Sequence, residues 1–167
     1  MATVTTEYRA SSNLTVTALS TLASDANLRA GWTSAEIDNT TDKDLDKVVS
    51  ARFTLGASPT TAKQIQVYAY AMLDDSTWPA GSFSAGTPGT EGAATIIDDE
   101  QKIGTFILLW SQATDADASG VYNMPPTSLR AVFGFMPAKC AVFATHNTVQ
   151  AFADSQVTVK GIYENIT

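Results

Sequence analysis

The sequence predicts an all-β protein: a single antiparallel β-sandwich, jelly-roll-like, with long surface loops and at most short helical turns. Three observations lead to this prediction. Short segments in which apolar and polar residues alternate recur throughout the 167 residues. Clusters of Gly, Pro, Asn, Asp and Ser separate these segments, and no amphipathic helix of ordinary length interrupts them. The count of roughly nine strands fits a jelly roll better than an immunoglobulin-like sandwich.

The N-terminal part of the chain is expected to be extended. Residues 1–12 are rich in Thr and predict an extended arm or an edge strand, with a frayed terminus as the alternative. Residues 13–167 would then form the one sandwich domain. Within them, Asn13–Leu19 alternates as a strand, a helical turn or two follows, and Ala30–Asn39 is extended again. Turn-forming residues at 39–44 separate this part from the next strand.

The clearest strand is Lys47–Leu55, in which every second residue is apolar. The turn-forming segment Gly56–Thr61 ends it, and Gln64–Leu73 follows with the same alternation. We therefore expect these two strands to form an antiparallel pair. The next segment, Asp74–Gly92, is too long for a hairpin turn. It predicts an ordered surface loop, which is a common place for contacts with a partner.

In the second half, Ala94–Ile97 predicts a short strand, followed by a turn at the sequence DDEQ. The segment Ile103–Gln112 is apolar on both faces, so we expect it in the middle of a sheet or in a subunit interface. Gly120–Met124 predicts another short strand, Thr127–Phe133 a turn or two of helix, and Gln156–Glu164 the closing strand.

Residues 129–147 include the most apolar strand near the C-terminus, and its two apolar faces predict a central position in a sheet. The same stretch holds the only Cys and the only His of the chain, Cys140 and His146. At about 3.3 Å per residue these side chains would lie roughly 20 Å apart, too far for a nucleophile and its base. We expect Cys140 to be a small buried hydrophobe and His146 to form hydrogen bonds at a turn. No enzyme activity is predicted.

Composition and charge exclude several classes of function. The net charge is −7, and the ten Lys and Arg residues are scattered, whereas binding of nucleic acid requires clustered positive charge. No apolar run is long enough to span a membrane. A single Cys excludes an internal disulfide framework, and the Cys and His content is too low for a zinc site. The N-terminal sequence has no secretory signal, so we expect synthesis in the cytoplasm.

The acidic clusters are expected to be solvated turns. Asp42, Asp44 and Asp46 resemble the first half of an EF-hand loop, but Lys47 stands at the sixth position and Phe53 at the twelfth. Those positions require Gly and a bidentate Glu. A weakly bound calcium ion in one of the acidic loops is the alternative. We predict no cofactor.

Aromatic and basic residues are the candidates for partner contacts. Exposed Trp and Tyr side chains can anchor a partner or stack on sugars, although outward Tyr residues on a strand also serve cross-strand packing. The candidates come from the N-terminal arm, the strand around residue 32, the strand at 64–73 and the long loop: Tyr8, Arg9, Trp32, Tyr68, Tyr70 and Trp78.

Three motifs resemble a known family. They are GWTSAEIDNTT at 31–41, VSARFTLGASPTTAKQIQVY at 49–68 and PAKCAVFATHNT at 137–148. Together they make the chain similar to small virion structural proteins of tailed bacteriophages. The resemblance implies a head decoration or cement protein with a jelly-roll-like fold, which sits as a trimer on the outside of the capsid shell. It implies the major capsid protein as partner and no catalytic residues.

The sequence therefore leads to two functional hypotheses. The first is a non-enzymatic cement protein on the outer capsid surface, where the acidic composition would also keep it away from packaged polyanion. The alternative is a carbohydrate-binding module of a phage tail fibre or head spike, with Trp78, Tyr68 or Tyr70 as stacking platforms.

Overall fold

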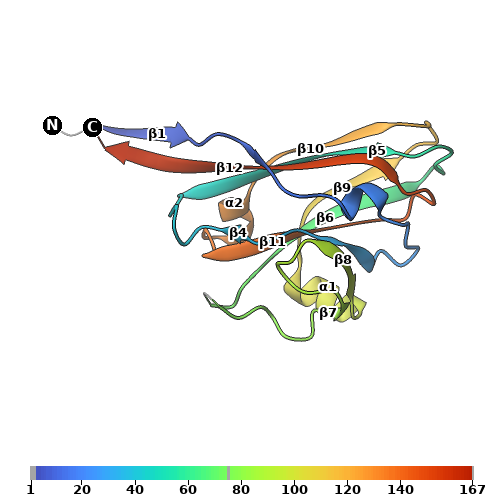
Figure 1. The fold of residues 1–167 in the computed structure, drawn as a ribbon, viewed down its shortest axis with the longest axis horizontal. Coiled ribbons are helices and arrows are strands. Elements are labelled where there is room, and N and C mark those ends of the chain that lie inside the picture. The colour runs from blue at the N-terminus through green and yellow to red at the C-terminus, as the bar shows by residue number, and fades with distance from the viewer. Residues whose placement is uncertain (1–2, 75, 167) are drawn as a thin grey trace.

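The computed structural model describes residues 3–74 and 76–166. Two antiparallel sheets pack face to face, as Figure 1 shows, and the helices are short. This architecture confirms the all-β sandwich predicted from the sequence. In the part of the chain that the structure describes, no helix has the length and apolar character needed to cross a membrane.

The first sheet has five strands in the order β1-β12-β5-β10, with β2 beside β12. The second sheet has seven strands in the order β7-β8-β3-β11-β6-β9, with β4 beside β11. The strands of the first sheet are β1 (Val4–Tyr8), β2 (Ser12–Asn13), β5 (Asp46–Leu55), β10 (Val121–Ser128) and β12 (Phe152–Ile166). Those of the second sheet are β3 (Ala30–Thr33), β4 (Ile37–Asp38), β6 (Lys63–Ala71), β7 (Phe83–Ala85), β8 (Gly92–Ile96), β9 (Ile107–Thr114) and β11 (Lys139–His146). The helices are η1 (Leu19–Thr21), α1 (Asp99–Thr105) and α2 (Leu129–Phe133).

The strand orders β1-β12-β5-β10 in the first sheet and β3-β11-β6-β9 in the second are those of a jelly roll. β5 pairs with β12 and β10, whereas β6 pairs with β11 and β9. The predicted antiparallel pair of Lys47–Leu55 and Gln64–Leu73 is therefore wrong. The alternation in both segments was correctly interpreted, but their apolar faces meet across the interior instead of lying side by side in one sheet.

The main core lies between the two sheets. From β5 it receives Val49, Phe53 and Leu55, and from β6 it receives Ile65 and Val67, all at most 1% exposed. Burying a side chain of this size stabilises the fold by roughly 1.5–3 kcal/mol. The two-residue alternation of these strands thus follows from having one face in this core.

A second, aromatic core covers the outer face of the second sheet. The chain between β6 and β9 folds back over β6 and β11, so that Phe83, Ile96 and Phe106 pack against Tyr70 and Phe143. β11 is consequently buried on both faces, with every residue from 140 to 146 buried. The prediction of a central strand in the 129–147 stretch is confirmed.

Two predictions for residues 98–112 need correction. The DDEQ turn is the start of α1, because Asp98 caps the helix by accepting a hydrogen bond from the Gln101 amide and acidic residues fill the first turn. Ile103 belongs to this helix. The strand that follows, β9, is an edge strand with an open side, and it does not lie in the middle of the sheet. Its alternative assignment, to a subunit interface, stays a prediction.

The predicted arm, residues 1–12, contains β1 and the first residue of β2; residues 1 and 2 lie outside the described residues, as do 75 and 167 of the predicted domain. β12 pairs with β5 from Phe152 to Ile162, and beyond Ile162 it pairs with β1 as far as Ile166. β1 and the end of β12 therefore form a two-stranded ribbon that projects past the sandwich, at the left of Figure 1. We call it the terminal ribbon.

Candidate functional site

Cys140 and His146 lie at opposite ends of β11, and both are fully buried. Burial raises the pKa of the Cys140 thiol to about 12, so it stays protonated at neutral pH. The His146 ring lies 2.9 Å from the Thr148 hydroxyl, and its Nε2 donates a hydrogen bond of 3.0 Å to the Leu22 carbonyl. Burial lowers the pKa of His146, although the bond to Leu22 opposes this shift. Its predicted hydrogen-bonding role is confirmed, within the core.

The acidic loop at 42–46 serves ion pairing. The Asp44 carboxylate is fully buried and accepts hydrogen bonds from Arg9 Nε at 2.6 Å and from Lys47 Nζ at 2.9 Å. Asp46 accepts from the Ser128 hydroxyl and the Arg130 amide instead. Within residues 3–74 and 76–166, no three Cys, His, Asp or Glu residues lie close enough to hold a metal ion.

Two of the predicted contact residues are inside the protein. Trp32 and Tyr70 are fully buried, so the prediction that they are exposed is wrong. The Trp32 ring donates a hydrogen bond of 2.9 Å to Glu91, and the Tyr70 hydroxyl lies 2.5 Å from the Thr33 hydroxyl. Trp78 is partly buried and packs against Tyr70 with 5.2 Å between ring centroids. Trp32 belongs to the main core between the sheets, whereas Tyr70 and Trp78 belong to the aromatic core. Alternation in a strand cannot show that its second face is also covered.

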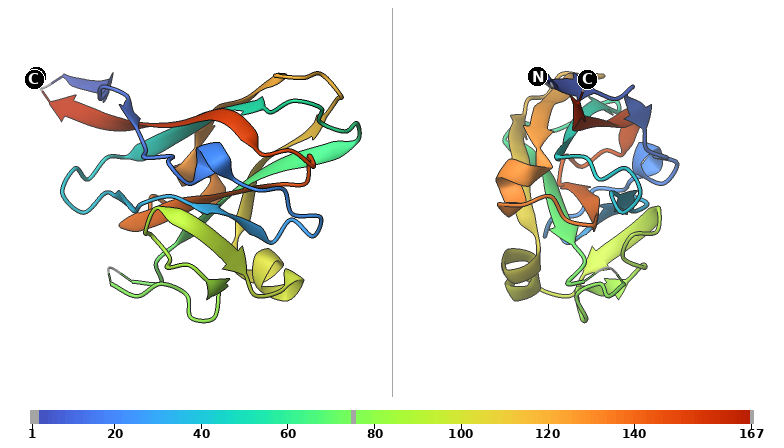
Figure 2. Two further views of the ribbon diagram at one scale, coloured as in Figure 1. Left: turned by 45° about the vertical axis from the view of Figure 1, so that its right-hand side comes forward. Right: turned by 90° about the vertical axis from the view of Figure 1, so that its left-hand side faces the viewer.

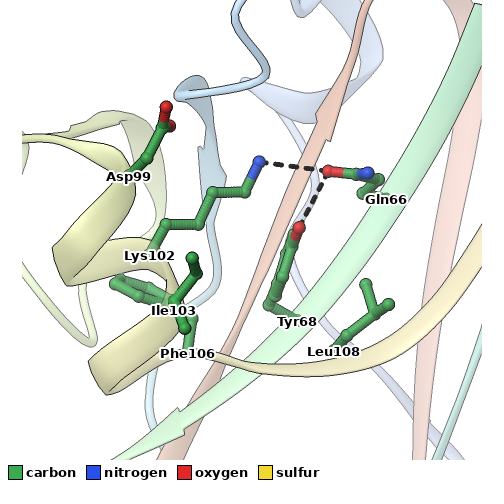
Figure 3. Close-up of a pocket in the computed structure, with 7 residues that line it drawn as sticks. All are labelled: Gln66, Tyr68, Asp99, Lys102, Ile103, Phe106 and Leu108. Atoms are coloured by element: carbon green, nitrogen blue, oxygen red, sulfur yellow. Dashed lines mark hydrogen bonds between the residues drawn. The ribbon is translucent and has the colours of Figure 1, made fainter.

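Tyr68 borders an open groove of about 510 Å³ between α1 and the strands β6 and β9. Figure 3 shows Tyr68 and Gln66 on one side and Asp99 and Lys102 of α1 on the other. Apolar side chains of α1, β9 and their connection complete the lining: Ile103, Phe106 and Leu108. Tyr68 lies on the outer face of β6, as predicted, but it is 8% exposed, so the prediction that it is exposed is wrong.

The polar groups of this groove bind one another. The Tyr68 hydroxyl donates to Gln66 Oε1 at 2.8 Å, and Lys102 Nζ donates to the same oxygen at 3.1 Å and to the Leu28 carbonyl at 2.7 Å. Burial raises the pKa of Tyr68 to about 12 and lowers the pKa of Lys102. The Lys102 amine lies 5.2 Å from the centre of the Tyr68 ring and covers it. The groove therefore presents apolar surface beside the Asp99 carboxylate and these hydrogen-bonded groups.

The terminal ribbon carries the other two predicted contact residues. Tyr8 is 62% exposed, and Val4 and Ile166, which pair across the ribbon, are 57% and 70% exposed. Glu7 joins the two strands, because its carboxylate accepts hydrogen bonds from Tyr163 at 2.7 Å and from Asn165 at 2.8 Å. These bonds lower the pKa of Glu7, the bond from Asn165 most strongly. The ribbon thus has an ordered polar seam and exposed apolar side chains.

Arg9 fixes the base of the ribbon. Its backbone amide donates to the Gly161 carbonyl at 2.9 Å, and its guanidinium lies 4.8 Å from the Tyr163 ring centre while pairing with Asp44. Gly161 is required at this point, because a Cβ there would overlap the Asp44 carboxylate. Burial raises the pKa of Asp44, but Lys47 and Arg9 outweigh this effect, and the pKa is lowered. We call Arg9, Asp44, Lys47 and Gly161 the ribbon anchor.

Sequence reasoning missed the anchor and part of the exposed apolar surface. The EF-hand comparison drew attention to Asp44, but its partner Arg9 is 35 residues away in sequence and no local pattern connects them. Leu73, which follows β6, and Phe135, which follows α2, are 75% and 62% exposed. An apolar residue directly after a left-handed glycine cap such as Gly134 commonly packs back on the helix, so no local pattern indicates that Phe135 is exposed.

Neither the comparison with protein-family models nor the search of curated proteins finds a match for this chain.

Proposed function

We propose that the chain is a non-enzymatic structural protein of a phage particle, a decoration or cement protein that binds the outer face of the major capsid shell and stabilises it. In this proposal it acts as a homo-oligomer, a trimer like the proteins it resembles, on the outside of the virion. The motifs behind the resemblance fall on the scaffold strands β3, β4, β5, β6 and β11. The fold alone does not select a function, because jelly rolls occur in capsid proteins and in lectins.

The terminal ribbon is the observation that favours capsid attachment. An isolated two-stranded ribbon is marginally stable in water. This one projects past the sandwich, keeps Val4, Tyr8 and Ile166 exposed, and is nevertheless held at its base by the pairing of Arg9 with the buried Asp44 carboxylate. Such an element is suited to docking on a large partner, because covering its apolar side chains lowers the free energy of the complex.

The charge distribution is compatible with an outer position. The chain has 17 acidic and 10 basic residues, and four of the bases, Arg9, Arg52, Lys47 and Lys139, pair with acidic side chains of the same molecule. A surface of this kind is repelled by packaged nucleic acid. The outer face of the shell is the side on which that repulsion is weakest.

The alternative is a carbohydrate-binding module of a tail fibre or head spike. Of its three predicted platforms, Tyr70 is buried and Trp78 packs against it. The groove at Tyr68 is then the place for a sugar ring, but Lys102 covers the ring face and would have to move. A host surface glycan that shifts the NMR signals of Gln66, Tyr68 and Lys102 would favour this alternative over the structural role.

The test uses particles of the phage that encodes this chain, prepared from a strain in which its gene is deleted. Purified protein is added back, and binding is measured by cosedimentation over a range of concentrations. We expect the full-length chain to saturate the particles and deletion of residues 1–12 to weaken binding by about tenfold or more. The deletion removes the exposed side chains of β1 and the anchoring residue Arg9.

Because the deletion could weaken binding by disturbing the fold, two point variants serve as controls. Val4→Lys places a charge on the exposed ribbon, whereas Ile97→Lys makes the same change at a site that is 41% exposed and lies outside the ribbon. Weaker binding of Val4→Lys alone supports the proposal. Full-length protein that does not bind the particles, or a Val4→Lys variant and a deletion variant that both bind as tightly as the full chain, would contradict it.

A further inference from the structure

Eight of the exposed large apolar residues lie in two places, the terminal ribbon and the side of the sandwich formed by α1, β9, α2 and β10. On that side lie Leu73, Ile103 and Phe135, which are 75%, 83% and 62% exposed, and Ile107 and Leu108, which are 39% and 49% exposed. The right-hand view of Figure 2 shows α1, β9, α2 and β10 along this side. We call these five residues the apolar edge.

Three hollows lie along the apolar edge, and each is lined by two of its residues. A hollow between α1 and α2 is lined by Leu73, Gly104, Ile107 and Phe133. It shares Leu73 with a smaller hollow at Phe135, and its lining residues Gly104 and Ile107 neighbour in sequence the residues that line the groove at Tyr68. Exposed apolar residues that gather on one side in this way mark an interaction site in a soluble protein.

β9 itself lacks the features that protect an edge strand. Residues 107–114 contain no charged residue and no Pro. The edge strand of the other sheet on this side, β10, contains Pro125 and Pro126 and a register shift between Met124 and Thr127. β7, at the far end of the second sheet, has three residues. β9 has one bulge, near its start, and then pairs regularly with β6 from Trp110 to Thr114. An eight-residue edge without charge is expected to be covered in the functional state.

The net charge of the molecule indicates which partner covers β9 and the apolar edge. Each molecule carries a net charge of −7, so two copies repel each other over most of their surfaces. All five residues of the apolar edge are uncharged, with Asp74, Asp99 and Lys102 at the border of its hollows. An apolar centre with a polar border is the usual composition of a protein interface. A basic partner would prefer the acidic surface, whereas the apolar edge of a second copy matches this one.

We propose that the apolar edge is the contact surface between copies of this chain in solution. This inference rests on the homo-oligomer of the proposed function, but it does not depend on attachment to a capsid. It assigns self-association to α1, β9 and the segments around Leu73 and Phe135, and leaves the terminal ribbon free for another partner.

The test is sedimentation velocity of the full-length protein over a range of concentrations up to roughly 100 µM. We expect the wild-type protein to sediment as an oligomer. Ile103→Lys and Leu73→Lys change the two most exposed residues of the apolar edge, so folding should be unaffected, which circular dichroism and the melting temperature would verify. Each substitution should weaken association by about tenfold or more. Val4→Lys, the matched control on the ribbon, should sediment like the wild-type protein.

A wild-type protein that stays monomeric overturns the inference, and so does an oligomer that persists in the double variant Ile103→Lys/Leu73→Lys. An oligomer that only Val4→Lys dissociates places the contact on the ribbon and also overturns it. A monomer that binds capsids would overturn this inference and the homo-oligomer of the proposed function, and would leave capsid attachment standing. An oligomer that depends on the apolar edge but binds no particles would do the reverse.

Discussion

The terminal ribbon and the apolar edge both expose apolar side chains, but the fold supports them differently. The ribbon stands away from the body and depends on the ribbon anchor, in which a fully buried carboxylate binds two cations. The apolar edge lies directly on the sandwich, and its exposed side chains carry no charge. A projecting element needs specific polar contacts to keep its direction, whereas a surface on a packed sheet is already rigid. The two regions should therefore respond differently to substitution.

The largest expected effect on stability is at the anchor. Asp44→Ala leaves Lys47, whose side chain is 7% exposed, without its closest anion. We expect the free energy of unfolding in urea to fall by about 3 kcal/mol, because the buried Lys47 amine then keeps only the exposed Asp42 carboxylate, 3.4 Å away, as its anionic partner. The control is Asp154→Ala, which breaks the exposed pair of Arg52 and Asp154 and should change stability by less than about 0.5 kcal/mol. Equal effects of the two substitutions would show that the anchor is no stronger than a surface ion pair.

Two glycine substitutions, one in the ribbon anchor and one in α1 beside the apolar edge, compare the two regions directly. Gly161→Ala places a Cβ against the Asp44 carboxylate, and Gly104→Ala, in α1, adds a Cβ that meets no atom within 4 Å. We expect the first change to lower the free energy of unfolding by about 2 kcal/mol through displaced packing. The second should raise it by about 0.5 kcal/mol, since Ala favours a helix. Thermal unfolding of both variants measures this, and a neutral Gly161→Ala would contradict the tight packing of the anchor.

A further expected effect is a change of stability with pH, which arises in the core and in neither of the two regions. The chain has one His, and burial lowers the pKa of His146 in the folded state. The unfolded chain therefore binds a proton below about pH 6.5 that the folded protein binds less readily, and stability falls as the pH drops below that value. The slope can reach about 1.4 kcal/mol per pH unit.

Urea unfolding between about pH 5 and 7.5 tests this, with His146→Gln as the variant in which the slope should disappear. The ribbon anchor contributes nothing in this range, because the pKa of Asp44 is lowered and its contribution is lost only in acid. A slope that remains in His146→Gln would mean that another group, outside the core, titrates between these pH values.

The sequence predicted the sandwich and its central strand because those features depend on local patterns. One-sided burial produced the alternation in β5, and burial on both faces produced the apolar run in β11. Strand pairing was not predictable in the same way. A short turn between β5 and β6 is compatible with a hairpin and with a crossing between sheets, and only the packing of the whole chain decides between them.

The candidate contact residues were predicted less well. A covered second face hides Tyr70, although its strand alternates like one with an exposed face. Conversely, Ile107 and Leu108 belong to an apolar run that is typical of a central strand, but they lie at an open edge. An apolar run shows that a strand is to be covered. It does not show whether the covering surface belongs to the same molecule.

A cryo-EM reconstruction of particles of the encoding phage tests the central claim most directly. We expect density for this sandwich on the outer face of the shell, with Val4, Tyr8 and Ile166 against the major capsid protein and the apolar edges of neighbouring copies in contact. A shell without this density, or one in which the terminal ribbon points away from it into solvent, would contradict the account.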